Sequence, residues 1–135
     1  ENSFTKGIVE WKGFLPTDKF QKQLGQCRAF INTPKWNEAY GNVIVEALAC
    51  GVPVVAYDLG GPGELIEDGL NGFLVKPNDL EGMIKAIKSV SKIKRKNCRN
   101  WFEKNASNKV FAVRVENWIN KGLNQSIVKN LEKIN

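Results

Sequence analysis

Two glutamates that flank the start of a helix have the clearest chemical potential in this chain. Seven residues separate Glu38 from Glu46, and the sequence between them predicts a loop followed by a helix from about Asn42 to Cys50, with Gly51 as its stop. A helix that opens after a glycine presents unpaired N–H groups at the positive end of its dipole. Because Gly41 has no side chain to obstruct an approaching anion, a phosphate group could bind there.

The two carboxylates have different expected places around that helix start. Glu46 lies four residues beyond Asn42, on the same helix face and about one turn deeper, where it could accept hydrogen bonds from vicinal hydroxyls. Glu38 lies in the loop after the expected strand Arg28–Thr33, and open α/β sheets bind ligands at that end of their strands. Each feature also has an ordinary explanation, since carboxylates commonly cap helices and the Val43 side chain suits a core.

The elements that must position these residues alternate between short apolar strands and helices. Each expected strand is rich in apolar or β-branched residues and is bounded by Gly, Pro, Asn or Asp. This alternation predicts an α/β fold, a Rossmann-like parallel sheet with flanking helices. The expected strands are Gly7–Phe14, Arg28–Thr33, Pro53–Tyr57 and Gly72–Val75, and the other helices of this part are Asp18–Gln26 and a brief one at Glu64–Glu67.

Beyond Pro77 the pattern is helical only. Asn78, with Glu81 three residues later, resembles a capping box at a helix start. Val110–Val115 suits either a strand or a helix, and we favour a helix that ends at Gly122. A last short helix is expected at Ser126–Ile134. The chain is therefore interpreted as one truncated domain, residues 1–135, in which residues 1–77 alternate strands and helices and residues 78–135 are helical.

Composition excludes several classes of function. The chain has a net charge of +6, and its basic residues are concentrated in residues 76–135, with fourteen Lys and Arg against five Asp and Glu. A basic stretch such as Lys92–Lys96 is typical of a solvated helix face, so no nucleic acid is expected as a partner. The sequence shows no membrane-spanning run and no signal peptide, which favours the cytoplasm, with peripheral contact at the inner face of the membrane left open. The chain has no His and no Asp-x-Asp pair, so no metal or other cofactor is expected.

The run from Glu38 through Gly51 into Val52–Ala56 resembles one known signature. It is similar to the C-terminal nucleotide-sugar-binding domain of retaining GT-B glycosyltransferases, the group called family 4 or group 1. The resemblance covers about residues 8–90, and its further matches are Val9–Phe14, Asn32–Pro34, Gly60–Glu64 and Asp68–Pro77.

This resemblance implies an enzyme of polysaccharide biosynthesis that transfers a sugar from a nucleoside diphosphate to a glycan or lipid-linked acceptor, with retention of configuration. Glu38 would be the catalytic residue that meets the donor sugar hydroxyls. The Asn42 and Val43 amides, beside Gly41, would face the diphosphate, and Glu46 would hold the ribose. Ala39, Tyr40 and Trp36 depart from the residues that the family often has, which leaves the sugar preference open.

Parts of such an enzyme are expected outside this chain. The family places an Arg and a Lys that grip the phosphates in an upstream part of the same domain, and an acceptor-binding domain before that. We therefore expect the isolated chain to be inactive. In a 3-2-1-4-5-6 sheet, two strands would be missing between Gly7–Phe14 and Arg28–Thr33. The exposed edge predicts a homodimer, with relocation of the first strand as the alternative.

Two other classes of function stay open at this point. A GT-B-type sugar-nucleotide epimerase would also bind a nucleotide with an α/β domain, although the glutamate pair disfavours it. A non-enzymatic basic module could bind nucleic acid or an anionic surface through residues 85–104. Salt would separate that module from a nucleotide site, because polyanion binding weakens steeply as salt rises.

Overall fold

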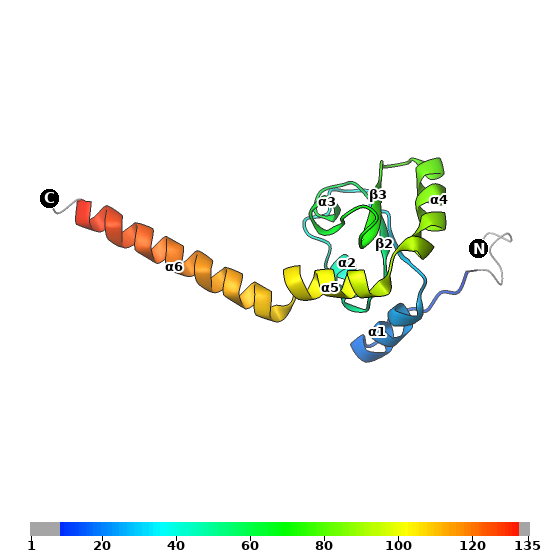
Figure 1. The fold of residues 1–135 in the computed structure, drawn as a ribbon, viewed down its shortest axis with the longest axis horizontal. Helices are drawn as coiled ribbons and strands as arrows, with labels where there is room; N and C mark the ends of the chain where they lie inside the picture. The colour runs from blue at the N-terminus through cyan, green and yellow to red at the C-terminus, as the bar shows by residue number, and fades with distance from the viewer. Residues whose placement is uncertain (1–8, 133–135) are drawn as a thin grey trace.

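The computed structural model describes residues 9–132, with side chains described for residues 9–123. Figure 1 shows an α/β body from which one long helix extends. The elements in chain order are α1 (Thr17–Gln26), β1 (Phe30–Asn32), α2 (Asn42–Ala49), β2 (Val54–Tyr57), α3 (Pro62–Leu65), β3 (Gly72–Val75), α4 (Leu80–Ser89), the 3₁₀ helix η2 (Val90–Lys92), α5 (Arg95–Asn105) and α6 (Asn108–Glu132).

The three strands form one parallel sheet in the order β1-β2-β3. Phe30 pairs with Val54 at the start of β1, and Val54 pairs in turn with Gly72 of β3. Parallel neighbours need a crossover between them, and α2 and α3 lie in the two crossover segments. The expected α/β fold with a parallel sheet and flanking helices is therefore confirmed.

The two faces of the sheet are covered by different helices. Alternate residues of a strand point to opposite faces, so Val54 and Ala56 of β2 point to one face and Val55 to the other. On the first face α1, α2 and α5 contribute Leu24, Ile44, Leu48 and Trp101 to one apolar cluster. On the second face α4 contributes Met83 and Ala86 to a separate cluster around Val55. The central strand is thus buried on both sides.

The expected strand Gly7–Phe14 is not formed. Residues 9–14 have no strand pairing, and Trp11 and Phe14 expose 91% and 96% of their surface; residues 7 and 8 lie outside the described residues. A strand needs a neighbour for its backbone hydrogen bonds, and this segment does not pair with β1. The apolar content of the segment was therefore insufficient evidence for a strand. Association between chains stays a prediction.

Two helix starts in the body differ from the sequence prediction. Helix α3 runs from Pro62 to Leu65 and not from Glu64 to Glu67, because a proline is well suited to the first turn of a helix. The cap of α4 is Asp79 and not Asn78, since the Asp79 carboxylate accepts a hydrogen bond from the Gly82 amide at 2.8 Å. Asn78 instead adopts a left-handed conformation, with φ of 64°.

The C-terminal part of the chain forms one helix where two were expected. Helix α6 is continuous from Asn108 to Glu132, so the helical interpretation of Val110–Val115 is confirmed and the expected stop at Gly122 is wrong. The separate helix Ser126–Ile134 is also wrong up to residue 132, and its last residues lie outside the described ones. A glycine inside a helix costs about 1 kcal/mol relative to alanine, which helix-favouring neighbours can offset.

Candidate functional site

The loops that follow β1 and β2 meet at Glu38. The backbone of Glu38 forms a parallel bridge with Gly60. The Glu38 N–H donates to the Leu59 carbonyl at 3.1 Å, and the Gly61 N–H donates to the Glu38 carbonyl at 2.7 Å. The structure therefore brings Glu38 against the Gly60–Gly61 loop, at the carboxyl ends of two parallel strands, where open α/β sheets bind ligands.

Gly60 and Gly61 are required for this junction. A Cβ atom on Gly60 would lie 2.5 Å from the Glu38 carbonyl oxygen, and one on Gly61 would lie 2.4 Å from the Tyr40 carbonyl oxygen. Both distances are far below a normal contact, and the atoms that would be met belong to the backbone. The paired glycines of the motif are thus explained by the close approach of two main chains.

Helix α2 begins immediately after this junction. Gly41 is buried and left-handed, with φ of 98°, a conformation that disfavours any residue with a side chain. Its carbonyl accepts hydrogen bonds from the Ile44 and Val45 amides. The Asn42 and Val43 amides precede the first of these bonds, so the geometry of a helix start gives them no acceptor inside the helix. Both residues are exposed.

The other predicted acid lies further along α2. Glu46 is exposed, one turn beyond Asn42, and Glu38 is partly buried beside the glycine loop. Within the chain, Gly41 therefore separates a carboxylate on the β1 loop from a carboxylate on the helix. The roles of the two acids, and the cleft that they were expected to share, stay predictions.

Backbone hydrogen bonds close the C-terminal end of α2, in contrast to its open N-terminal end. The Gly51 N–H donates to the Leu48 carbonyl and the Val52 N–H donates to the Ala47 carbonyl, both at 2.9 Å. This pair of hydrogen bonds defines a Schellman motif. Gly51 takes the left-handed conformation that this motif requires. The expected glycine stop of this helix is confirmed.

Two arginines from α5 complete that end, and the sequence analysis missed their role. Arg99 donates to the Ala49 carbonyl at 2.7 Å and Arg95 to the Cys50 carbonyl at 3.3 Å. Arg95 belongs to the basic stretch interpreted as a solvated face. Cations do favour helix C-termini. The local sequence, however, does not indicate that an arginine will contact the end of a helix more than forty positions earlier in the chain.

The thiols near this helix are held in their neutral form. Burial raises the pKa of Cys98 on α5 to about 11. Burial also raises the pKa of Cys50 at the end of α2, while Arg99 opposes this rise, Glu46 adds to it and Arg95 opposes it more weakly. A thiol reacts as its thiolate, so neither cysteine is suited to act as a nucleophile at neutral pH.

The structure gives two findings on metals and membranes for the part of the chain that it describes. Among those residues, no group of three or more His, Cys, Asp or Glu is arranged to hold a metal ion. Within the same range, no helix combines the length and the apolar character of a membrane span.

Three comparisons identify similar proteins. Over 101 residues the chain is 32% identical to a sucrose synthase of Acidithiobacillus caldus, covering 72% of this chain and 13% of that protein. Over 86 residues it is 35% identical to a D-inositol 3-phosphate glycosyltransferase of Rhodococcus erythropolis, covering 62% of this chain and 20% of that protein. The crystal structure of Anabaena Alr3699/HepE in complex with UDP and glucose matches with a TM-score of 0.71 and 27% identity, over 89% of this chain and 33% of that chain.

These matches define how much of a larger protein the chain corresponds to. It spans a fifth or less of the two relatives and a third of the crystallised protein. The family model described as "Glycosyl transferases group 1" matches residues 2–109, which include both glutamates, the glycine loop and helix α2. The chain therefore belongs to the family of glycosyl transferases group 1.

Proposed function

We propose that this chain is the C-terminal donor-binding part of an enzyme that transfers a sugar from a nucleoside diphosphate to a glycan or lipid-linked acceptor with retention of configuration. One observation carries the proposal: α2 opens at a left-handed glycine, with two exposed residues in its first turn, next to the junction that holds Glu38 against Gly60–Gly61. The similar Anabaena protein has been crystallised in complex with UDP and with UDP-glucose, which supports a donor of this class.

The diphosphate is the group that the helix start fits. When the bond between the sugar and the diphosphate breaks, negative charge grows on the departing phosphate oxygens. The Asn42 and Val43 amides present fixed donors and the positive end of the α2 dipole to that charge. Because these groups are held in place before the reaction, they stabilise the transition state without reorganising.

The two carboxylates complete the donor site at either side of the diphosphate. Glu46 lies one turn along the helix, at a place suited to accept hydrogen bonds from the ribose hydroxyls. Glu38 precedes the helix and meets the hydroxyls of the transferred sugar, as the resemblance to the family implies. The sugar is thus held by a loop residue and the nucleotide by a helix residue.

The remaining parts of the site come from outside this chain. The proposal includes an upstream Arg and Lys that grip the phosphates and an N-terminal domain that binds the acceptor. Fixed cations and amides then take the place of a metal ion. The enzyme would act in the cytoplasm, where contact with the inner face of the membrane would bring it to lipid-linked acceptors.

The test separates the roles of the two glutamates in the full-length protein. Glu46→Ala should raise the Kd for UDP roughly tenfold, because it removes the hydrogen bonds to the ribose. Glu38→Gln should leave the Kd for UDP within about twofold of wild type and lower kcat for sugar transfer by at least about a hundredfold. Calorimetry gives the first value and a UDP-release assay the second.

Glu81→Gln on α4 is the matched control, since it removes an exposed acid on the opposite face of the sheet. It should change neither value. The donor-site assignment fails if all three variants bind UDP and transfer sugar as the wild type does.

The alternative of a basic module that binds polyanions has less support. Two exposed cations of residues 85–104 already have partners within the chain, because Arg95 and Arg99 donate to backbone carbonyls of the helix ends. A UDP affinity that changes little between 50 and 200 mM salt, together with negligible affinity for DNA, would favour the donor site.

A further inference from the structure

Helix α2 carries most of the proposed donor site, so its placement decides where that site points. It has eight residues, too few for a stable helix in isolation. Its N-terminal end must stay open to receive the phosphates. The contacts that fix its direction therefore have to come from its buried face and from its C-terminal end.

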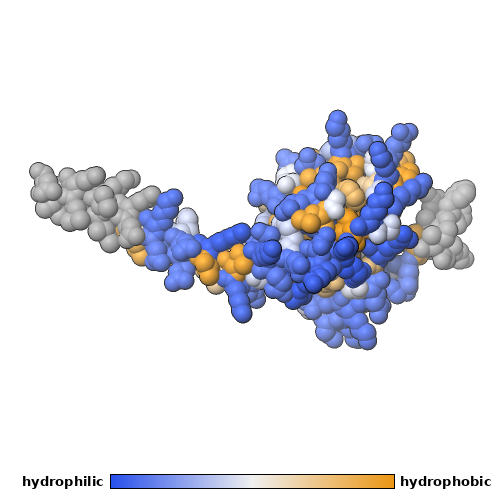
Figure 2. Space-filling model, viewed as in Figure 1, coloured by the Kyte–Doolittle hydropathy of each residue, from blue (hydrophilic) through white to orange (hydrophobic). Residues whose placement is uncertain are grey.

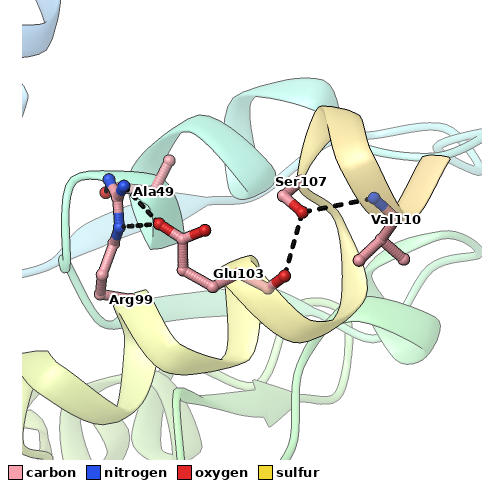
Figure 3. A network of polar contacts seen from close by, with 5 residues as sticks. All are labelled: Ala49, Arg99, Glu103, Ser107 and Val110. Carbon is pink, nitrogen blue, oxygen red and sulfur yellow. Dashed lines mark hydrogen bonds and ion pairs between the residues drawn. The ribbon is translucent and has the colours of Figure 1, made fainter. Parts of the chain in front are cut away.

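Arg99 is already oriented for this task by its own helix. Its Nε donates to a carboxylate oxygen of Glu103 at 2.8 Å, its Nη2 forms an ion pair with the same oxygen, and its guanidinium lies 5.5 Å from the centre of the Phe102 ring. Its Nη1 donates to the Ala49 carbonyl, the last residue of α2 (Figure 3). The guanidinium therefore contacts a carboxylate, a ring and a backbone carbonyl at once, while 54% of the side chain stays exposed. Its planar fork is preorganised, so it loses less entropy per hydrogen bond than a flexible ammonium group would.

The same network continues beyond Arg99. Figure 3 shows the Ser107 hydroxyl donating to the Glu103 carbonyl, at 3.0 Å, and accepting from the Val110 amide, at 3.5 Å. The bonds therefore run from the end of α2 along α5 to the first turn of α6. The residue that pairs with Arg99 thus also takes part, through its backbone carbonyl, in the junction between α5 and α6.

Arg95 ties the same terminus to α1. Its Nη2 donates to the carbonyls of Gly25 and Cys50, and its Nη1 donates to the Cys27 carbonyl at 2.8 Å. One guanidinium thus joins the C-terminal ends of α1 and α2. A Cβ atom on Gly51 would lie 3.2 Å from the Arg95 carbonyl oxygen, so the start of α5 also packs directly on the α2 stop.

We propose that Arg99, supported by Arg95, is a positioning residue for the donor site. It touches no substrate. By holding the C-terminal carbonyls of α2, it fixes the axis of the helix and keeps the Asn42 and Val43 amides and the Glu46 carboxylate aimed at the donor. This inference rests on the proposed function, since the site that Arg99 positions is the proposed one.

The experiment compares two arginines that make the same kind of bond. Arg114 donates to the carbonyl of Asn105, the last residue of α5, at 2.9 Å, so Arg114→Ala removes one charge and one terminal hydrogen bond away from α2. In the full-length protein, Arg99→Ala should raise the Kd for UDP roughly fivefold, and Arg114→Ala should leave it unchanged. Arg99→Lys keeps the charge but loses the planar fork that contacts Glu103 and Ala49 together, so it should recover only part of the affinity.

Hydrogen exchange gives a second readout that needs no ligand. The amides of Ile44–Ala49 should exchange faster in Arg99→Ala than in Arg114→Ala, while those of β3 exchange equally in both variants. If Arg99→Ala weakens UDP binding no more than Arg114→Ala does, the positioning role is overturned. If the wild type does not bind UDP at all, the proposed function fails. If the α2 amides then also exchange at the same rate in both variants, Arg99 does not stabilise the position of the helix either.

Discussion

Helix α2 has eight residues and buries Ile44, Ala47 and Leu48 completely, whereas α6 has 25 residues and leaves large apolar side chains in solvent. Helix α2 lies in the crossover between two parallel strands and is packed by α5 as well. Helix α6 leads away from the body beyond its junction with α5 (Figure 1). An apolar face thus predicts a helix, but the neighbours of the helix decide whether that face is buried.

The described part of α6 is exposed nearly all round, and several of its apolar residues lie along one side of the helix. Those with helical spacing form an apolar stripe, which consists of Phe111, Val115, Trp118, Ile119 and Leu123. Phe111 exposes 67% of its surface and Trp118 exposes 76%. Figure 2 shows orange atoms on this arm between blue ones.

The largest expected effect comes from the same substitution made on each helix. Leu48→Ala should lower the free energy of unfolding by about 2 to 5 kcal/mol, because Leu48 is fully buried and the change leaves a cavity. Leu123→Ala on α6 should cost less than about 1 kcal/mol in the 135-residue chain. Urea denaturation monitored by circular dichroism measures both. Equal losses of free energy in the two variants would contradict the difference in burial between the two helices.

A smaller effect is expected at the entry to α2. Gly61→Ala places a methyl group against the Tyr40 backbone and should lower the free energy of unfolding by about 1 to 3 kcal/mol, as overpacking does. Displacement of the Glu38–Tyr40 segment should also weaken UDP binding by the full-length protein. Gly63→Ala is the control, because its Cβ would meet only the flexible Asp58 carboxylate, and an unchanged UDP affinity in both variants would argue against the junction as part of the site.

The sequence predicted the local parts of this structure well. The strands around Phe30–Asn32, Val54–Tyr57 and Gly72–Val75 and helix α2 follow from apolar runs between glycines and prolines, whose effects act over a few residues. The candidate site was recognisable for the same reason, since Glu38, Gly41 and Glu46 belong to one continuous motif.

The features that the sequence did not predict depend on distant partners. Residues 9–14 are apolar enough for a strand, but a strand forms only where another offers its backbone groups. The contacts of Arg95 and Arg99 were not predicted, because the carbonyls that they bind are distant in the sequence. Those bound by Arg95 lie 45 to 70 positions away, and the one bound by Arg99 lies 50 positions away. The end of α6 was mispredicted because a glycine permits a helix stop without requiring one.

The smallest effect is expected at Trp118, although it is the largest side chain of the apolar stripe. In the 135-residue chain, Trp118→Ala should change the free energy of unfolding by less than about 0.5 kcal/mol, because the indole makes few contacts that folding could lose. A loss of about 3 to 5 kcal/mol in the same chain, the usual cost of truncating a buried tryptophan, would show that α6 folds back on the body. Measuring the variant in the full-length protein sharpens the comparison, since a cost that rises there means that another part of the protein covers the stripe.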